Sequence, residues 1–295
     1  MEIIFLGTGQ AIPTKRRNHT AILLRHEDES ILFDCGEGTQ RQFRIARVNP
    51  CKLTRIFITH WHGDHVLGLP GLLQTLALNN YKKTLYVYGP IGTKRFFSII
   101  LRTFMFKQRI NVVIKEMRKS IKEKNFLVEA FRLNHGCPCL GYSFKEKDKR
   151  KIDIKALRRL GIKPGPIIGM LQKGKSIRLG KRIIKAKDVT YIKKGRKVSI
   201  ILDTALCNNC YTAARDANIL ICEATYSQEL KDKAAEYKHL TARQAAQIAK
   251  KARAKKLVLT HISQRYEDKN KKILLEAKKI FKNSVLAHDF MKISV

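Results

Sequence analysis

The sequence predicts an α/β protein in which buried strands alternate with helices. Residues 53–59 are rich in β-branched and aromatic side chains, as in a buried strand, and residues 66–76 have the apolar content of a helix. Residues 198–204, 218–225 and 256–263 are further predicted strands, each with an acidic residue or a histidine near its end. Ligands bind at such strand ends in α/β sheets, so these residues are the candidates for function.

The remaining elements continue this alternation. In chain order we expect a strand at 1–6, a hairpin from 21–24 and 30–36, a helix at 39–48, a strand at 81–89, a helix at 90–106, a strand at 126–131 and a helix at 242–254 capped by Thr241. Thr59-His60 and Thr260-His261 both end predicted strands, which indicates two related halves.

Length and charge bound the function. The 295 residues can bury a large core, as one large domain or two fused halves, and 44% of them are hydrophobic. Lys and Arg number 60 against 24 Asp and Glu, a formal charge of +36. A polyanionic partner, most often nucleic acid, is the usual reason for such an excess, and a generally lysine-rich proteome is the alternative.

The location is predicted from what the sequence lacks. Only four apolar residues, 3–6, follow Glu2, so no signal peptide is expected. No apolar run approaches the ~20 residues that span a membrane. The seven cysteines, an odd number, fit reduced thiols, and we expect a cytoplasmic protein without a membrane partner.

Three of the nine histidines fall within residues 60–65, His-Trp-His-Gly-Asp-His. Alternate side chains of an extended segment share a face, so His60 and His62 point to one spot. Asp64 and His65 follow the turn at Gly63 and reach a second spot nearby. Imidazole and carboxylate ligands suit two metal ions, and a metal pair suits in-line displacement at phosphorus. The alternative is a surface loop that happens to be rich in histidine.

Two segments are strongly basic. The loop Pro13-Thr14-Lys15-Arg16-Arg17-Asn18 suits holding phosphates near a metal site, or is an ordinary solvated turn. Residues 145–197 hold 20 Lys and Arg against 4 Asp and Glu, a net of +16. We interpret them as a projecting arm with a Gly-Pro hinge, a short helix at 154–160 and no core of its own. Such an arm suits gripping a phosphate backbone, and a solvated insertion without a partner is the alternative.

The spacing His-x-His-x-Asp-His after a buried strand resembles the signature of the metallo-β-lactamase superfamily. The resemblance implies an αββα sandwich, two mixed sheets flanked by helices, formed as a single domain from halves at about 1–144 and 198–295. Residues 145–197 would be inserted between them. Members of the superfamily cleave lactams, thioesters and phosphodiesters, so this motif does not set the substrate.

Further motifs resemble one branch, the tRNA 3′-processing endonucleases of the tRNase Z type. Pro13, Lys15, Arg17 and Asn18 match its basic loop, and Gly165, Pro166 and Gly169 match the Gly-Pro motif of its arm. Cys-Glu-Ala-Thr at 222–225 and His-Leu-Thr at 239–241 match its remaining motifs. The resemblance extends from Gly7 to about Ile293.

This resemblance implies a full set of site residues. One zinc would be held by His60, His62 and His135, a second by Asp64, His65 and His261, and Asp203 would bridge them. Asp64, Glu223 and His239 would be catalytic. Lys15, Arg17, Asn18, Gly165, Pro166 and Gly169 would bind substrate. Taken alone, His135 could be a structural histidine, Asp203 an N-cap and Glu223 a surface residue.

The resemblance implies a zinc-dependent endoribonuclease that removes the 3′ trailer from precursor tRNA and acts as a homodimer. Two Zn²⁺ per subunit are expected, with Mn²⁺ or Fe²⁺ as possible replacements. Alternatives are another nuclease or phosphodiesterase of this superfamily, a non-catalytic RNA-binding protein on the same scaffold, and a thioesterase. Cys137, Cys139, Cys207 and Cys210 could form a four-thiolate site, although Cys-x-Cys is a poor zinc knuckle.

Overall fold

The computed structural model describes residues 1–104, 110–162, 165–180 and 182–295, which form two compact units. The main unit comprises Met1–Lys122, Val128–Phe144 and Lys197–Val295. The insertion unit comprises Glu123–Leu127 and Lys145–Arg196. No helix of the described residues is both long enough and apolar enough to cross a membrane.

The described strands of the main unit form two seven-stranded sheets. The first has the order β18-β1-β2-β3-β4-β5-β6, with bounds Lys292–Ser294, Glu2–Gly7, Ala21–His26, Glu29–Phe33, Arg55–Phe57, Thr84–Gly89 and Asn111–Glu116. Its β18-β1-β2-β3 part is antiparallel and its β3-β4-β5-β6 part is parallel, so the sheet is mixed.

The second sheet has the order β17-β16-β15-β14-β9-β8-β7. The bounds are Ser284–Leu286, Leu257–Thr260, Ile219–Glu223, Lys197–Ile201, Cys139–Glu146, Phe126–Leu133 and Ser120–Lys122. The four strands β14 to β17 are parallel, and β14, β15 and β16 are apolar over most of their length because both faces of the sheet are covered.

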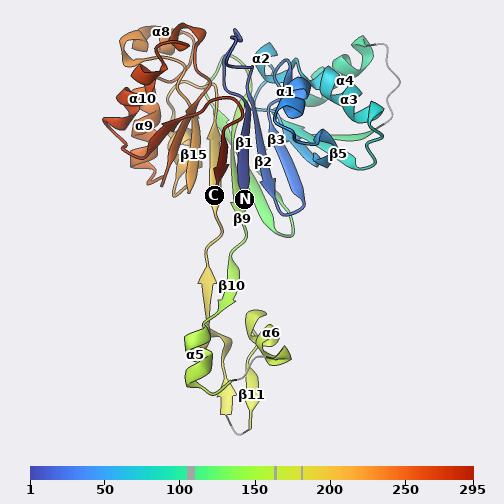
Figure 1. Ribbon diagram of the computed structural model, residues 1–295, viewed down its shortest axis with the longest axis vertical. Coiled ribbons are helices and arrows are strands. Elements are labelled where there is room, and N and C mark those ends of the chain that lie inside the picture. The colour runs from blue at the N-terminus through green and yellow to red at the C-terminus, as the bar shows by residue number, and fades with distance from the viewer. Residues whose placement is uncertain (105–109, 163–164, 181) are drawn as a thin grey trace. The chain divides into compact units, whose positions relative to one another are not determined.

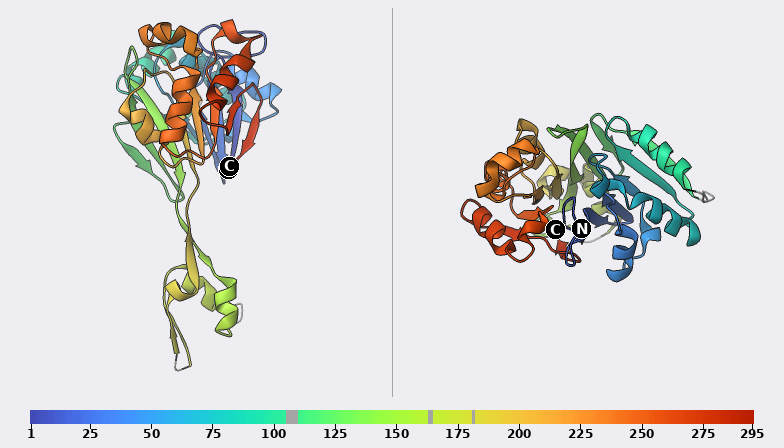
Figure 2. Two further views of the ribbon diagram at one scale, coloured as in Figure 1. Left: turned by 90° about the vertical axis from the view of Figure 1, so that its left-hand side faces the viewer. Right: turned by 90° about the horizontal axis from the view of Figure 1, so that it is seen from above.

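Helices cover the outer face of each sheet (Figures 1 and 2). The first sheet packs against α1 (Thr39–Ile45), α3 (Leu69–Leu78) and α4 (Thr93–Thr103) through one apolar cluster. The second packs against α7 (Asn208–Ala214), α9 (Ala242–Lys251) and α10 (Asn270–Lys278) through another. The shorter elements are α2 (Gly63–Val66), α8 (Lys231–Glu236), η1 (Pro50–Lys52), η3 (Gln228–Leu230) and η4 (Gln264–Tyr266).

Aromatic side chains join the two sheets. Tyr142 of β9 is fully buried, and its ring contacts Phe33 of β3 and Phe57 of β4 at centroid distances of 5.8 and 5.2 Å. The Tyr142 hydroxyl donates to the carbonyl of Ile58 at 2.6 Å, which satisfies the buried phenol. This contact fixes the second sheet against the chain that leads to His60.

The predicted elements other than the helix at 66–76 are confirmed with changed boundaries. The hairpin of β2 and β3 forms, and Thr241 caps α9 through a capping box with Gln244. The single helix predicted at 66–76 is wrong, because the chain forms α2 and α3 separated by Leu67 and Gly68. The helix expected at 39–48 ends at Ile45, and α4 occupies 93–103 of the predicted 90–106, whose last two residues lie outside the described ones.

The insertion unit contains two-stranded sheets from β10 (Lys149–Ile152) with β13 (Thr190–Lys193) and from β11 (Ile177–Leu179) with β12 (Arg182–Ile184). Its helices are α5 (Ile154–Arg159), α6 (Pro166–Gln172) and η2 (Ala186–Asp188). The expectation that this segment lacks a core is wrong. Its apolar residues are scattered in sequence but converge in space around Leu157, Leu171 and Val189. Pro164 of the expected hinge lies outside the described residues.

Candidate metal centre

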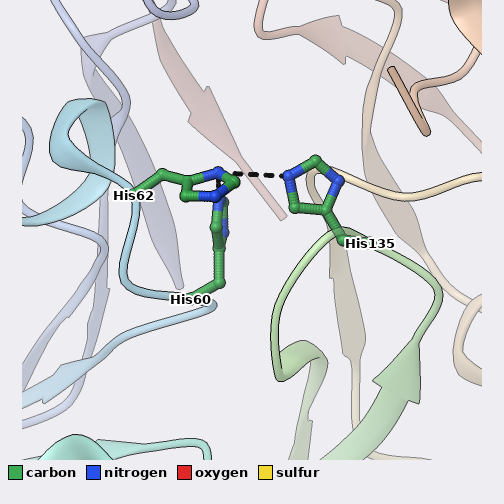
Figure 3. A group of neighbouring side chains, drawn as sticks. All are labelled: His60, His62 and His135. Atoms are coloured by element: carbon green, nitrogen blue, oxygen red, sulfur yellow. Dashed lines mark hydrogen bonds between the residues drawn. The ribbon is translucent and has the colours of Figure 1, made fainter. Parts of the chain in front are cut away.

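The chain leaves β4 at Phe57 and presents His60 and His62 at the end of the first sheet. His135 follows β8 of the second sheet. The Nε2 atom of His60 and the Nε2 atom of His135 lie 3.1 and 3.2 Å from Nδ1 of His62. Figure 3 shows these three side chains converging from the two sheets. Three nitrogen ligands within 4.8 Å of one another form a first group that could hold a metal ion.

A second group lies beside the first and contains Asp64, His65, Asp203 and His261. The Nε2 atom of His65 is 3.3 Å from Oδ2 of Asp64, and the Nε2 atom of His261 is 3.4 Å from the same oxygen. His261 directly follows β16 and has a positive φ of 57°, a conformation that is uncommon for residues other than glycine.

The Asp203 carboxylate lies between the two groups. Its Oδ1 atom is 3.1 Å from Nε2 of His261, in the second group. Its Oδ2 atom is 3.7 Å from Nε2 of His60 and 3.9 Å from Nε2 of His135, in the first group. One oxygen faces each group, which is the arrangement of a carboxylate that can bridge two metal ions.

Two buried polar atoms of the second group lack hydrogen-bond partners among the described residues, and a metal ion could take the place of such partners. Nε2 of His65 and Oδ1 of Asp203 are buried and make no hydrogen bond within the described part of the chain. A buried polar atom without a partner is costly, so an ion that accepts their lone pairs would satisfy them. Burial disfavours the charged Asp203 carboxylate, but His261 and His65 outweigh this effect and hold its pKa well below the usual range. The carboxylate is therefore anionic at neutral pH.

Asp34, which follows β3, orients this site and was not predicted from the sequence. Its Oδ2 atom accepts a hydrogen bond from Nδ1 of His65 at 2.6 Å, and its Oδ1 atom accepts one from the backbone N–H of Thr59 at 2.7 Å. The bond to Nδ1 leaves Nε2 of His65 available to bind a metal ion. The only signal in the sequence was an acidic residue at the end of a predicted strand, as at Asp203.

Other imidazoles are oriented in the same way. Nδ1 of His135 lies 3.1 Å from the carbonyl of Lys238, and Nδ1 of His261 lies 3.0 Å from the hydroxyl of Thr225. A carbonyl only accepts, so Nδ1 of His135 carries the proton and its Nε2 atom is free to bind a metal.

His239 and Glu223 form a pair next to the second group. Nδ1 of His239 is 3.2 Å from both carboxylate oxygens of Glu223 and 3.9 Å from Oδ2 of Asp203. Burial opposes the charged imidazole, but the carboxylates of Glu223 and Asp203 prevail and raise the pKa of His239 to about 9. Glu223 is buried at the end of β15 and also accepts from the backbone N–H of Thr204 at 2.8 Å. An imidazole held in this way can donate a proton at neutral pH.

Two glycines permit the close packing that brings α2 to the end of β3. A Cβ atom at Gly68 would lie 2.0 Å from the carbonyl oxygen of Gly36, and one at Gly36 would lie 2.4 Å from the carbonyl oxygen of Asp64. The backbone N–H of Gly68 donates to the carbonyl of Cys35 at 2.9 Å, and the backbone N–H of Cys35 donates to the carbonyl of His65 at 2.8 Å. Any side chain at Gly36 or Gly68 would push α2 and its ligands away from the sheet.

Trp61 packs beside the ligands. Its Nε1–H donates to the hydroxyl of Thr93 at 2.9 Å, and its ring lies 5.3 Å from that of Phe96 in α4. These contacts fix the segment between His60 and His62 against α4, consistent with a packing role.

The basic loop at 13–18 is fastened to the main unit. Arg17 is only 5% exposed, and its guanidinium donates to the Thr8 hydroxyl and to the carbonyl of Ala287, each at 2.7 Å. The backbone N–H of Asn18 donates to Asp289 at 2.7 Å. Among Lys15, Arg17 and Asn18, which were predicted to bind substrate, Lys15 is the one whose side chain is exposed to solvent.

The predicted substrate residues of the insertion unit lie at the start of α6. Gly165, Pro166 and Gly169 are all exposed. A Cβ atom added at Gly165 or at Gly169 would meet no atom within 4 Å, so this surface is open to a partner.

The four-thiolate site is not supported. Within the described ranges, the groups that could hold a metal contain histidine and carboxylate ligands and no cysteine. Cys139 donates instead to the carbonyl of Asp203 at 3.3 Å, whereas the sulfur atoms of Cys207 and Cys210 lie 3.5 Å apart.

Comparisons with known proteins agree with this geometry. The family model described as "Anti-Pycsar protein Apyc1" matches residues 1–135. The ribonuclease Z of Methanothermobacter thermautotrophicus is 41% identical over 299 residues, which cover 100% of this chain and 97% of the relative. The crystal structure of the short form of human tRNase Z has a TM-score of 0.74 and 31% identity, covering 100% of this chain and 99% of that chain.

A more distant solved structure supports the fold alone. YhfI from Bacillus subtilis, described as a metallo-β-lactamase fold protein, has a TM-score of 0.70 and 17% identity. The alignment covers 99% of this chain and 98% of that chain. The predicted α/β architecture with two mixed sheets and flanking helices is therefore confirmed.

Proposed function

The chain belongs to the ribonuclease Z family of metal-dependent endoribonucleases, which remove the 3′ trailer from precursor tRNA, and we propose that its seven clustered ligands bind two zinc ions for this reaction. His60, His62 and His135 hold one ion, and Asp64, His65 and His261 hold the other. The observation that carries the proposal is the Asp203 carboxylate, which turns one oxygen toward each group. Family membership favours this activity over a thioesterase or a non-catalytic RNA-binding protein.

The ligand set favours zinc. Five imidazole and two carboxylate ligands suit Zn²⁺, and Mn²⁺ or Fe²⁺ are the expected substitutes in a site of nitrogen and oxygen donors. When bound, such a pair supplies Lewis acidity that activates water and stabilises negative charge on a phosphoryl group. Asp64 is placed to orient the attacking water and to accept its proton, because its carboxylate belongs to the second group and lies at the start of α2.

His239 acts on the leaving group. Attack of water at phosphorus breaks the bond to the 3′ oxygen of the mature tRNA, and that oxygen leaves with a proton from His239. Glu223 holds the imidazole of His239 in place, because its carboxylate binds Nδ1 and favours the charged form of the ring. The products are a tRNA with a 3′-hydroxyl and a trailer with a 5′-phosphate.

The basic segments bind the RNA backbone. Lys15 contacts a phosphate near the cleaved bond, whereas Arg17 and Asn18 contribute by fixing the loop that carries Lys15, because their polar groups are engaged with Thr8, Asp289 and the backbone. The insertion unit, with Gly165, Pro166 and Gly169 on open surface, binds the tRNA backbone through contacts of its own. A precursor tRNA substrate favours action in the cytoplasm.

The enzyme acts as a homodimer. The helix α4 buries only Thr93 and Phe97 and leaves Phe96 and Ile99 exposed, and Ile91 just before it is also exposed. An exposed apolar patch of this kind is typical of an interface between subunits. Replacement of Ile99 by Asp should shift the protein from dimer to monomer in size-exclusion chromatography with light scattering. An unchanged dimer would place the interface elsewhere.

The function is tested with a 3′-extended precursor tRNA and the zinc-loaded protein, mapping the cut to the nucleotide. The expected products end in a 3′-hydroxyl on the tRNA and a 5′-phosphate on the trailer. Replacement of His239 by Ala should lower kcat by about 100-fold or more, whereas replacement of the exposed His288 should not. Full cleavage by the His239→Ala protein, or a cut outside the trailer junction, would refute the assignment.

The role of the insertion unit in tRNA binding is tested by a deletion that leaves the two chain segments at its base in contact. Asp148 accepts from the backbone N–H of Gly195 and pairs with Lys194, so residues 149–193 can be replaced by a short glycine-serine link. The deleted protein should lose affinity for tRNA and keep hydrolysis of a small phosphodiester. Mixing it with His239→Ala protein should restore tRNA cleavage if the insertion of one subunit serves the site of the other. No recovery on mixing would refute action across the dimer.

A further inference from the structure

Cys207 and Cys210 form a sulfur pair that the proposed reaction does not use. They are spaced Cys-x-x-Cys, and their sulfur atoms are 3.5 Å apart. Cys210 is fully buried, whereas Cys207 is partly exposed at the point where the loop after β14 enters α7. A pair with one accessible and one buried thiol at this spacing is the arrangement of a redox-active dithiol.

The pair is not a metal site in the part of the chain that the structure describes. A structural zinc needs about four ligands, and no third histidine, cysteine or carboxylate atom lies close enough to these two sulfurs to form a group with them. Both cysteines contact the core of the second sheet, but Cys207 is only partly buried. Its sulfur also lies within hydrogen-bond distance of the Cys210 thiol and the Thr204 hydroxyl, so packing alone does not account for the pair.

We propose that Cys207 and Cys210 are a site of reversible oxidation, in which a small disulfide such as oxidised glutathione converts the two thiols to an intramolecular disulfide. The Cys207 thiolate attacks one sulfur of the oxidant, forms a mixed disulfide and releases one thiolate. The Cys210 thiol loses its proton and attacks the Cys207 sulfur, which forms the protein disulfide and releases the second thiolate. The two protons given up by the cysteines leave with the two small thiols, so the cysteines lose two electrons and the oxidant gains them.

The surroundings set which cysteine attacks. The thiol of Cys210 lies within hydrogen-bond distance of the Cys207 sulfur, as does the Thr204 hydroxyl at 4.0 Å. Together with the backbone N–H groups of Cys210 and Asn209, the Cys210 thiol outweighs burial and lowers the pKa of Cys207 to about 5. The Cys210 hydrogen bond and burial raise the pKa of Cys210 itself. Cys207 is thus the attacking thiolate and Cys210 the resolving thiol.

The backbone allows the disulfide to close. The N–H of Cys210 donates to the carbonyl of Cys207 at 3.1 Å, the bond of a tight turn whose end Cα atoms lie within about 7 Å. Disulfides span Cα separations up to roughly 7 Å, and the sulfurs need to approach from 3.5 Å to about 2 Å, which side-chain rotation can supply.

The loop that carries Cys207 also carries Asp203, and Thr204 connects them to the catalytic pair. The N–H of Thr204 donates to Glu223 at 2.8 Å, and its hydroxyl accepts from the N–H of Asn134, the neighbour of His135, at 3.0 Å. Oxidation consumes none of the seven metal ligands, so the disulfide form keeps its metal.

The test treats the full-length, zinc-loaded protein with oxidised glutathione and measures intact mass and peptide linkage. The wild type should lose two hydrogen masses, retain no glutathione and show a 207–210 linkage that dithiothreitol reverses. The Cys210→Ser protein should instead retain one glutathione on Cys207, and Cys51→Ser, which alters another partly exposed thiol, should behave as wild type. A glutathione that persists on the wild type, or a linkage between other cysteines, would overturn the proposal.

Two further readouts need no oxidised product. At pH 7, iodoacetamide should modify Cys207 at least about tenfold faster than Cys51, because a lower pKa gives more thiolate. Zinc content should be equal in the wild type and in Cys207→Ser. Equal alkylation rates would show that Cys207 is not the attacking thiolate. A zinc deficit in the variant would show that the pair binds metal.

Discussion

Replacement of Glu223 by Gln tests whether the Glu223 carboxylate keeps His239 protonated for the leaving-group step. The substitution keeps the shape of the side chain and the oxygen that accepts from Thr204, but removes the charge that lies 3.2 Å from Nδ1 of His239. The charged imidazole loses its nearest partner, so the pKa of His239 should fall from about 9 toward the ordinary value of 6.5. At pH 8 the protonated fraction would fall from about nine-tenths to about one in thirty, a loss of roughly 30-fold.

The assay is the pH dependence of kcat for cleavage of a precursor tRNA. A general acid is active while protonated, so the wild type should lose activity as the pH rises through about 9, and the variant should lose it at lower pH. A nitrophenyl phosphodiester, whose acidic phenol leaves without a proton, should be hydrolysed equally by both. Glu229→Gln, at an exposed carboxylate, is the matched control. An unchanged basic limb in Glu223→Gln would refute the role of the pair.

Three other predictions follow from named contacts. Asp34→Asn should weaken zinc binding by about 10- to 100-fold in a chelator competition, because His65 loses its charged acceptor, and unchanged affinity would refute this role. Gly68→Ala should lower the free energy of unfolding by about 3 kcal/mol in denaturant titration, whereas Gly169→Ala, whose Cβ meets nothing, should not. Lys15→Ala should raise KM for tRNA, and it should reduce the slope of log binding affinity against log salt concentration by roughly one. An unchanged slope would mean that Lys15 contacts no phosphate.

The residues proposed as metal ligands could be picked out from the sequence because their signal is local or lies at strand ends. His60 to His65 are adjacent in the sequence, and the strands before His135, Asp203 and His261 are apolar runs that end abruptly. The parallel strands β14, β15 and β16 then bring Asp203 and His261 to one edge of the second sheet. Which of the strand-end residues would be ligands came from the family resemblance, since spacing alone left His135 and Asp203 with ordinary structural explanations.

The residues that were missed depend on contacts that sequence patterns do not encode. Asp34 became important only because β3 lies beside β4, which brings its carboxylate to His65. Arg17 reads as a surface cation in sequence but is buried by the return of the chain at Ala287. The core of the insertion unit escaped prediction because its apolar residues, such as Leu157 and Val189, are isolated among lysines and meet only after folding.

The central claim is that two metal ions share the Asp203 carboxylate. It is tested most directly by metal analysis of the purified, zinc-reconstituted protein and of its Asp203→Ala variant by inductively coupled plasma mass spectrometry. We predict two zinc ions per wild-type chain and at most one in the variant, because each group loses the oxygen that faces it. A single zinc in the wild type, or two zinc ions retained in Asp203→Ala, would contradict the bridged pair.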